Sequence, residues 1–189
     1  MDDPLERFTG LYDQNYRNVL RYALQHAEPV CAEDVTSEAF LIAWRRLNDV
    51  PDPPLPWLLG VARNLLRKQA GADRQRRLII DRIAALSTED DLRSRDPGEH
   101  VADREAALRV LASLPERDIE TLTLVTWHGL DAAQAAIVTG CSARAFTVRL
   151  HRARQHLAKA MESFNQRQAN VTAWQNPALR RPSASNQGS

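Results

Sequence analysis

The side chains best suited to chemistry in this sequence are the basic and polar residues at positions 141–168. Six cationic residues stand against one acidic residue there, a net charge of +5 in a chain whose overall net charge is +1. Such a local excess suits contacts with the phosphates of nucleic acid. An amphipathic helix with a solvated basic face is the alternative, and the concentration of charge argues against it. The pattern therefore indicates DNA binding.

As a helix, this stretch has one basic face and one narrow apolar stripe. The basic face carries Arg144, Thr147, Val148, His151, Arg152 and Arg154, with Arg149 to its side. The stripe consists of Phe146, Leu150, Ala153 and Leu157. The N-terminal half of a recognition helix lies deepest in the major groove. We therefore expect Arg144, Thr147 and Val148 to specify bases. The later arginines should mainly meet phosphates.

No arrangement suited to catalysis or metal binding accompanies this helix. Cys31 and Cys141 form neither a disulfide framework nor a CxxC pair. The five histidines form no ligand cluster, and the sequence has no glycine-rich phosphate loop. We therefore predict that the protein is not an enzyme and uses no cofactor.

Local signals place the basic helix in a helix-turn-helix. An earlier helix ends by Gly129, and Asp131 can cap a short Ala-rich helix over residues 132–139. Gly140 follows, where a tight turn between helices needs a positive φ. Ser142 can then cap the basic helix.

Composition favours an all-α protein, and the length allows one or two small domains; the acidic stretch described below favours two small helical domains. The chain has 189 residues, only seven of them glycine, and shows no alternation of β-branched residues. No apolar run approaches the ~20 residues that span a membrane. The acidic N-terminus, MDDPLERF, has no apolar signal segment. We therefore expect a cytoplasmic protein without membrane insertion.

Three amphipathic helices are predicted in the first part of the chain, over residues 5–27, 32–47 and 55–77. In the second helix, Phe40 and Trp44 fall at the margin of the apolar face. Its opposite arc carries Asp34, Ser37, Glu38, Leu41 and Arg45. A leucine on that polar arc is weak evidence of a partner surface, because single exposed leucines are common.

The loop after the second helix is rich in proline. Residues 48–56 read NDVPDPPLP, and four prolines in nine residues forbid a helix and stiffen the chain. The loop is either a rigid connector or a preshaped pocket for an extruded base. The third helix then carries Arg63, Arg67 and Arg74 along one side, flanked by Asn64. That stripe could follow a phosphate backbone or be an ordinary solvated face.

Charge divides the rest of the chain. Residues 87–105 hold seven acidic residues and three arginines around Pro97 and Gly98, which is typical of a linker. The polar C-terminal residues favour disorder. The predicted division is a first domain at 1–78, an acidic flexible linker at 79–103, a second domain at 104–164 and a disordered tail at 165–189.

Four motifs in register resemble those of the extracytoplasmic-function (ECF) sigma factors of bacterial RNA polymerase. They are AEDVTSEAFLIAWRRL at 32–47, PWLLGVARNLLRK at 56–68, LPERD at 114–118 and GCSARAFTVRLHRAR at 140–154. The resemblance covers most of residues 5–163. It implies a transcription initiation factor with sigma region 2 in the first domain and region 4 in the second. Implied partners are core RNA polymerase (the β′ clamp and the β flap), promoter DNA and, as a further candidate, an anti-sigma factor.

The resemblance also implies roles for three surfaces. Asp34, Ser37, Glu38, Leu41 and Arg45 would dock on the clamp. Asn48, Val50, Asp52, Arg63, Asn64 and Arg67 would capture and hold the melted minus-10 element. Arg144, Thr147, Val148, Arg149, His151, Arg152 and Arg154 would bind the minus-35 element. The acidic linker resembles the segment that passes through the RNA exit channel.

Departures from the family pattern limit what is carried over. Members usually have Gln at the position of Ser37, and often E-I-A where this chain has Gln134, Ala135 and Ala136. They commonly have Gly, Lys and Ser at the positions of Arg144, Thr147 and Val148. The minus-35 sequence therefore cannot be transferred from other members.

Two other classes of protein fit parts of the pattern. A stand-alone transcriptional regulator would bind DNA with residues 114–157 and use residues 1–78 for sensing or dimerisation, but nothing in 1–78 suggests a ligand pocket. Dependence of promoter binding on polymerase separates this class from a sigma factor. An interaction protein, such as a sigma-factor inhibitor, would not need the basic helix.

Overall fold

The protein is described by a computed structural model over residues 3–69 and 106–175, where every regular element is an α-helix. The N-terminal unit, residues 3–69, contains α1 (Pro4–His26), α2 (Pro29–Arg45) and α3 (Leu55–Gln69). The C-terminal unit, residues 106–175, begins with a helix at 106–112. It continues with α6 (Glu116–Thr126), α7 (Ala132–Thr139) and α8 (Ala143–Gln175). The predicted all-α fold is confirmed.

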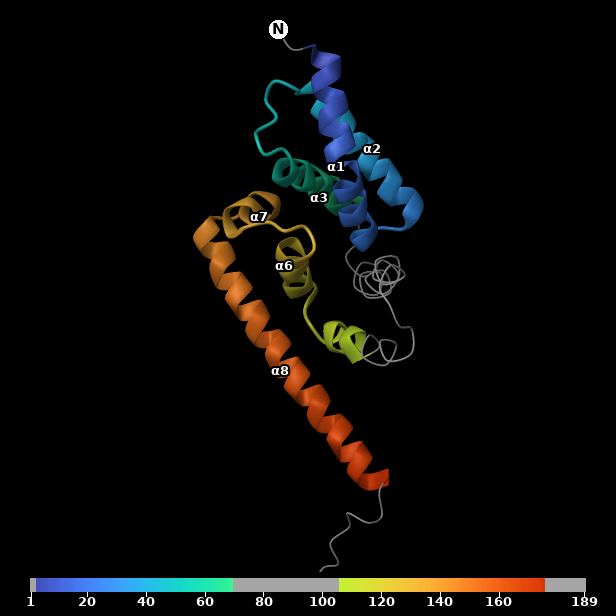
Figure 1. Ribbon diagram of the computed structural model, residues 1–189, viewed down its shortest axis with the longest axis vertical. Coiled ribbons are helices and arrows are strands. Elements are labelled where there is room, and N and C mark those ends of the chain that lie inside the picture. Colours follow the sequence, from blue (N-terminus) through green and yellow to red (C-terminus); the bar gives the residue numbers. More distant parts are fainter. Residues whose placement is uncertain (1–2, 70–105, 176–189) are drawn as a thin grey trace, which may run out of the picture.

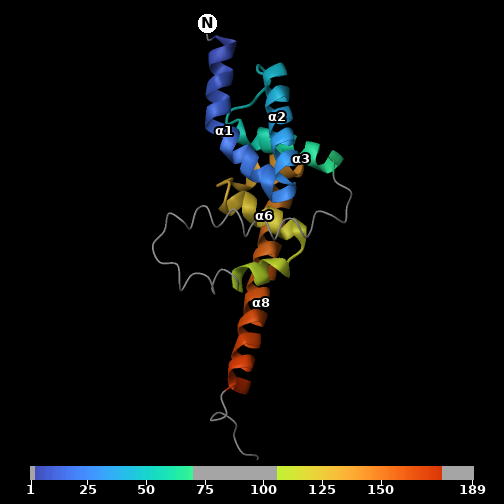
Figure 2. The ribbon, with the colours of Figure 1, turned by 90° about the vertical axis from the view of Figure 1, so that its right-hand side faces the viewer.

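The two units meet where α7 packs against α3 (Figure 1). Helices α1, α2 and α3 pack on one another, and α6 and α7 both pack on α8. The C-terminal part of α8 runs away from the N-terminal unit in both views (Figure 1, Figure 2). The predicted recognition helix is therefore the first part of a long, projecting helix.

One buried cluster of side chains spans both units. It includes Tyr22, Leu58 and Leu59 from the N-terminal unit, and Val138 and Phe146 from the C-terminal unit. Fully burying a large apolar side chain contributes roughly 1.5–3 kcal/mol. A smaller cluster, Leu114, Ile119, Leu122 and Ala153, lies between α6 and α8. The shared cluster joins the units through apolar burial as well as through sequence.

The predicted turn and cap signals of the helix-turn-helix are confirmed. The Gln134 N–H donates to the Asp131 carboxylate at 2.8 Å, and the Asp131 N–H donates to the Gln134 side chain at 3.1 Å. This reciprocal pair is a capping box. Gly140 has φ 68°, the left-handed conformation that glycine adopts without a steric penalty. The Ala145 N–H donates to Ser142 Oγ at 3.2 Å. These caps fix where α7 ends and α8 begins.

The structure corrects several details of the N-terminal prediction. Helix α2 begins at Pro29 rather than near residue 32, because proline is favourable in a first helical turn. Phe40 is 3% exposed rather than marginal, since its ring packs 4.8 Å from that of Tyr12 and 6.1 Å from that of Tyr16. Trp44 is 43% exposed, in keeping with a marginal position.

The C-terminal prediction also needs correction. Helix α6 ends at Thr126, three residues before Gly129. The predicted disordered tail is wrong for residues 165–175, which continue α8 to Gln175. That segment contains neither glycine nor proline, so nothing local interrupts the helix. The acidic linker at 79–103, Arg74 and residues 176–189 lie outside the described residues.

Candidate nucleic-acid interface

The N-terminal half of α8 presents the predicted basic face to solvent. Its exposed side chains are Arg144, Thr147, Val148, His151, Arg152 and Arg154, and Arg149 is half-buried beside them. Val148 is 46% exposed although it is apolar. The Thr147 hydroxyl donates to the Ala143 carbonyl at 2.9 Å, so its oxygen remains an acceptor. The face thus combines donors, an acceptor and a methyl-bearing side chain in adjacent turns.

This face is held by a rigid platform. Phe146 and Ala153 on the opposite side of α8 are fully buried, and the small side chains of Ala135 and Ala136 let α7 pack closely. An open cleft of about 830 Å³ runs beside the face, between α8 and the start of α6. The residues predicted to contact bases and those predicted to contact phosphates are therefore held on one packed helix.

A contact that the sequence did not predict ties α8 to α6. His156 Nδ1 lies 2.6 Å from the Asp118 carboxylate, although the two residues are 38 positions apart in the sequence. Asp118 is 7% exposed. In the sequence, His156 is one of five histidines without a cluster, and Asp118 is only part of the motif LPERD. Their pairing holds α8 against α6.

The predicted clamp-docking face is fully displayed on α2. Asp34, Ser37, Glu38, Leu41 and Arg45 are all exposed, while Val35, Ala39 and Ala43 on the other side are buried. Leu41 is 40% exposed amid these polar neighbours. The geometry brings together the complete set of residues that the sequence assigned to this surface.

The proline-rich loop is tied to α1 at its start. Arg7 Nη1 donates to Asn48 Oδ1 at 3.3 Å, and Arg7 Nη2 donates to the Leu47 carbonyl at 3.2 Å. Asp52 is exposed, whereas Val50 is half-buried and packs against the core. The loop is therefore anchored at one end and exposed at its tip.

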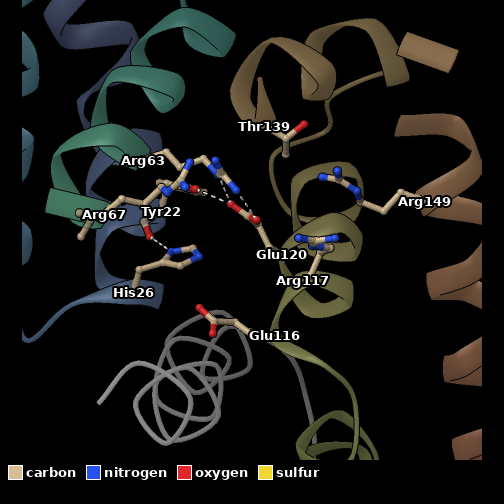
Figure 3. Close-up of a pocket in the computed structure, with 10 residues that line it drawn as sticks. Tyr22, His26, Arg63, Arg67, Glu116, Arg117, Glu120, Thr139 and Arg149 are labelled. Carbon is tan, nitrogen blue, oxygen red and sulfur yellow. Dashed lines mark hydrogen bonds and ion pairs between the residues drawn. The ribbon is translucent and has the colours of Figure 1, made fainter. Parts of the chain in front are cut away.

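The arginine stripe of α3 is divided between solvent and the C-terminal unit (Figure 3). Arg63 Nε donates to Glu120 Oε1 at 2.6 Å, and Arg63 Nη2 donates to Glu120 Oε2 at 3.1 Å. The Tyr22 hydroxyl also donates to Glu120 Oε1, at 3.0 Å. Asn64 and Arg67 are exposed. One predicted DNA contact, Arg63, is thus occupied by a carboxylate of α6.

Burial and charge set the ionisation of this cluster. Burial alone would raise the pKa of Glu120, but the hydrogen bond and charge of Arg63 hold that pKa below its ordinary value of 4.5. Complete burial, together with the Glu120 carboxylate, raises the pKa of the Tyr22 hydroxyl. The cluster therefore contains a carboxylate, a guanidinium and a neutral phenol at neutral pH.

The His128 side chain near this cluster is also buried. His128 is 8% exposed, and neither ring nitrogen has a hydrogen-bond partner among the residues that the structure describes. Its ring meets that of Tyr22 edge-on, with centroids 5.7 Å apart. Burial, with smaller contributions from Arg21 and His26, lowers the pKa of His128 to about 4. His128 is therefore a neutral side chain between the two units.

Comparison with known proteins identifies the family. The profile of sigma-70 region 2 matches residues 11–86, and that of sigma-70, region 4, matches residues 104–157. The ECF RNA polymerase sigma factor SigL of Mycobacterium tuberculosis is 27% identical over 159 residues, covering 82% of this chain and 89% of that protein. The chain belongs to the ECF sigma factors. Sigma factors of this family are transcription initiation factors that bind core RNA polymerase and promoter DNA.

Two further relatives of this ECF sigma factor differ in how much they share. The probable RNA polymerase sigma factor RfaY of Xanthomonas campestris is 34% identical over 128 residues, covering 65% of this chain. The chain spans about a third of that relative's length, 32%. In the solved structure of the RsbN–BldN complex, the matching chain is 29% identical, with 80% of this chain and 89% of that chain covered and a TM-score of 0.29.

Within the described part of this ECF sigma factor, no helix is long and apolar enough to cross a bilayer. The same ranges contain no group of three or more side chains that could hold a metal ion. The side chains predicted to take part in recognition lie on α2, the proline-rich loop, α3 and α8.

Proposed function

We propose that residues 104–164 form sigma region 4 and that the first half of α8 reads the minus-35 element. The observation that carries this proposal is the exposed basic face of α8 on a buried platform. Arg144 would donate to the acceptors of a guanine, and Val148 would contact a thymine methyl. Arg149, Arg152 and Arg154 would neutralise backbone phosphates, which position the helix without specifying sequence.

Holoenzyme binding to single-base promoter variants at several salt concentrations tests this division. Arg144→Ala should lose about 1–3 kcal/mol on the preferred minus-35 element and relax one base position. Arg152→Ala should weaken all variants alike and reduce the salt slope by about one. Equal weakening of every variant by Arg144→Ala would show that the helix docks differently.

Residues 1–78 are proposed to form sigma region 2, with the α2 face on the polymerase clamp. The exposure of all five residues of that face supports this role. The loop tip around Asp52 would receive a flipped base of the minus-10 element, with Asn48 and Val50 at its base. Asn64 and Arg67 would hold the upstream edge of the melted region. Arg63 would join them after exchanging the Glu120 carboxylate for a DNA phosphate.

The remaining assignments follow from this role. The acidic segment at 79–103 is proposed to pass through the RNA exit channel, and region 4 to contact the β flap. The protein would act in the cytoplasm, without catalytic activity of its own, and an anti-sigma factor is a candidate partner. Run-off transcription with core polymerase from a genomic promoter library tests the function. Promoter-specific binding without polymerase would indicate a stand-alone regulator instead.

A further inference from the structure

A polar cavity of about 360 Å³ lies between the N-terminal and C-terminal units. That volume falls within the range of small-molecule sites. Four arginines and two glutamates line it, together with Tyr22, His26, Leu66 and Thr139. Figure 3 shows Arg63 and Arg67 on one wall, and Arg117 and Arg149 on the other. The cavity exists only because the two units pack together.

Most of the positive charge in this cavity has no ion-pair partner within residues 3–69 and 106–175. Arg63 is paired with Glu120, but Arg67, Arg117 and Arg149 have no ion-pair or hydrogen-bond partner among the described residues. The nearby Glu116 offers one negative charge against these three. The three arginines come from three different helices, α3, α6 and α8. Like charges on facing walls repel, so an anion between them would stabilise the packed arrangement.

The geometry of the arginine side chains favours phosphoryl groups as ligands. A guanidinium presents several N–H donors in a planar fork that matches phosphate oxygens. Two linked phosphoryl groups carry more acceptor oxygens than one phosphate, and three arginines from facing walls, Arg67, Arg117 and Arg149, supply the donors. The Tyr22 hydroxyl already donates to Glu120, so its hydrogen is not free to bind an anion.

We propose that this cavity binds a small anion with two linked phosphoryl groups, of the pyrophosphate class. The bound anion would bridge the units and hold them together. Because Arg67 and Arg149 are also proposed DNA contacts, it would compete with promoter DNA, and this consequence alone depends on the proposed function. Binding itself depends only on the cavity.

Calorimetric titration of the full chain with inorganic pyrophosphate tests the proposal. The wild type should bind one pyrophosphate, and its melting temperature should rise with pyrophosphate concentration. Arg117→Ala should weaken binding at least tenfold while leaving the fold intact, because Arg117 is exposed. Arg17→Ala is the matched control, an exposed arginine on α1 outside the cavity. It should bind pyrophosphate as the wild type does.

Three results would overturn the proposal. The first is the absence of one-to-one binding to the wild type, and the second is equal affinity in Arg117→Ala. The third is equal affinity for sulfate at matched ionic strength, which would reduce the effect to general screening. Promoter-specific transcription by a protein that does not bind pyrophosphate would refute only this inference. Pyrophosphate binding by a protein inactive in transcription would refute only the proposed function.

Discussion

The Arg63–Glu120 ion pair allows a sharp test of how the two units are joined. The side chains are only 19% and 12% exposed, and two charge-assisted hydrogen bonds connect them. At an effective dielectric constant of about 20, two charges 4 Å apart attract by about 4 kcal/mol, and desolvation offsets part of this. Hydrogen bonds to charged groups contribute about 1.5–3 kcal/mol net. We therefore expect a coupling energy of about 2 kcal/mol.

Urea unfolding of the full chain measures this coupling in a double-mutant cycle. Arg63→Ala and Glu120→Ala should each destabilise the protein, and the double variant should cost about 2 kcal/mol less than their sum. Arg67→Ala with Glu120→Ala is the matched control, since Arg67 lines the same cavity and forms no ion pair with any residue that the structure describes. That pair should be additive within about 0.5 kcal/mol. The same additivity for Arg63 and Glu120 would refute the reasoning.

The coupling should also depend on pH in a defined direction. The pKa of Glu120 in the folded protein lies below its ordinary value of 4.5. Its contribution to stability is therefore complete above that value and is lost as the pH falls through the lowered pKa. Repeating the cycle at decreasing pH below 4.5 should reduce the coupling energy. A coupling that stays constant down to full protonation would contradict an ionic origin.

Three further predictions concern other parts of the structure. Gly60→Ala should leave the free energy of unfolding unchanged or raise it by about 0.5–1 kcal/mol, because an added Cβ would lie at an ordinary contact distance, 3.7 Å, from the Ile137 carbonyl oxygen. Gly60→Leu should instead force α3 and α7 apart and destabilise the protein. Thermal melts of the two variants test this difference. In the wild type, the free energy of unfolding should fall by about 3 kcal/mol as the pH drops from 6.5 to 4, because His128 binds a proton in the unfolded chain but not when buried. His128→Phe should remove this fall, and an unchanged pH profile would contradict the prediction. Leu41→Asp should abolish co-purification with core polymerase while the circular dichroism spectrum stays that of the wild type.

Signals that act within a few residues predicted this fold well. Asp131, Gly140 and Ser142 cap or terminate helices through their own backbone neighbourhood, so their types alone indicated the helix-turn-helix. The Arg63–Glu120 pair could not be predicted in this way. The two residues are 57 positions apart, and each sits in a pattern that equally fits a solvated helix face. The Asp118–His156 contact could not be predicted for the same reason, since only the packing of α6 on α8 brings those residues together.

The extension of α8 shows the converse error. Polar composition favoured disorder after residue 164, but composition does not break a helix that is already nucleated. Residues 165–175 lack proline and glycine, and the first proline after them is Pro177. Helix propagation from the packed part of α8 therefore outweighed the weak compositional signal.

The buried cluster shared by α3 and α7 determines how often the two units separate, and so the fraction of molecules in which Arg63 is released from Glu120. Separating the units would expose side chains such as Leu59 and Val138, which are now almost fully buried. If separation cost about 2 kcal/mol, roughly 3% of molecules would be separated at any moment. A partner that accepts only the separated state would then bind with an apparent affinity about 30-fold below its intrinsic affinity. A substitution at this contact would then change promoter use without altering any residue proposed to contact DNA.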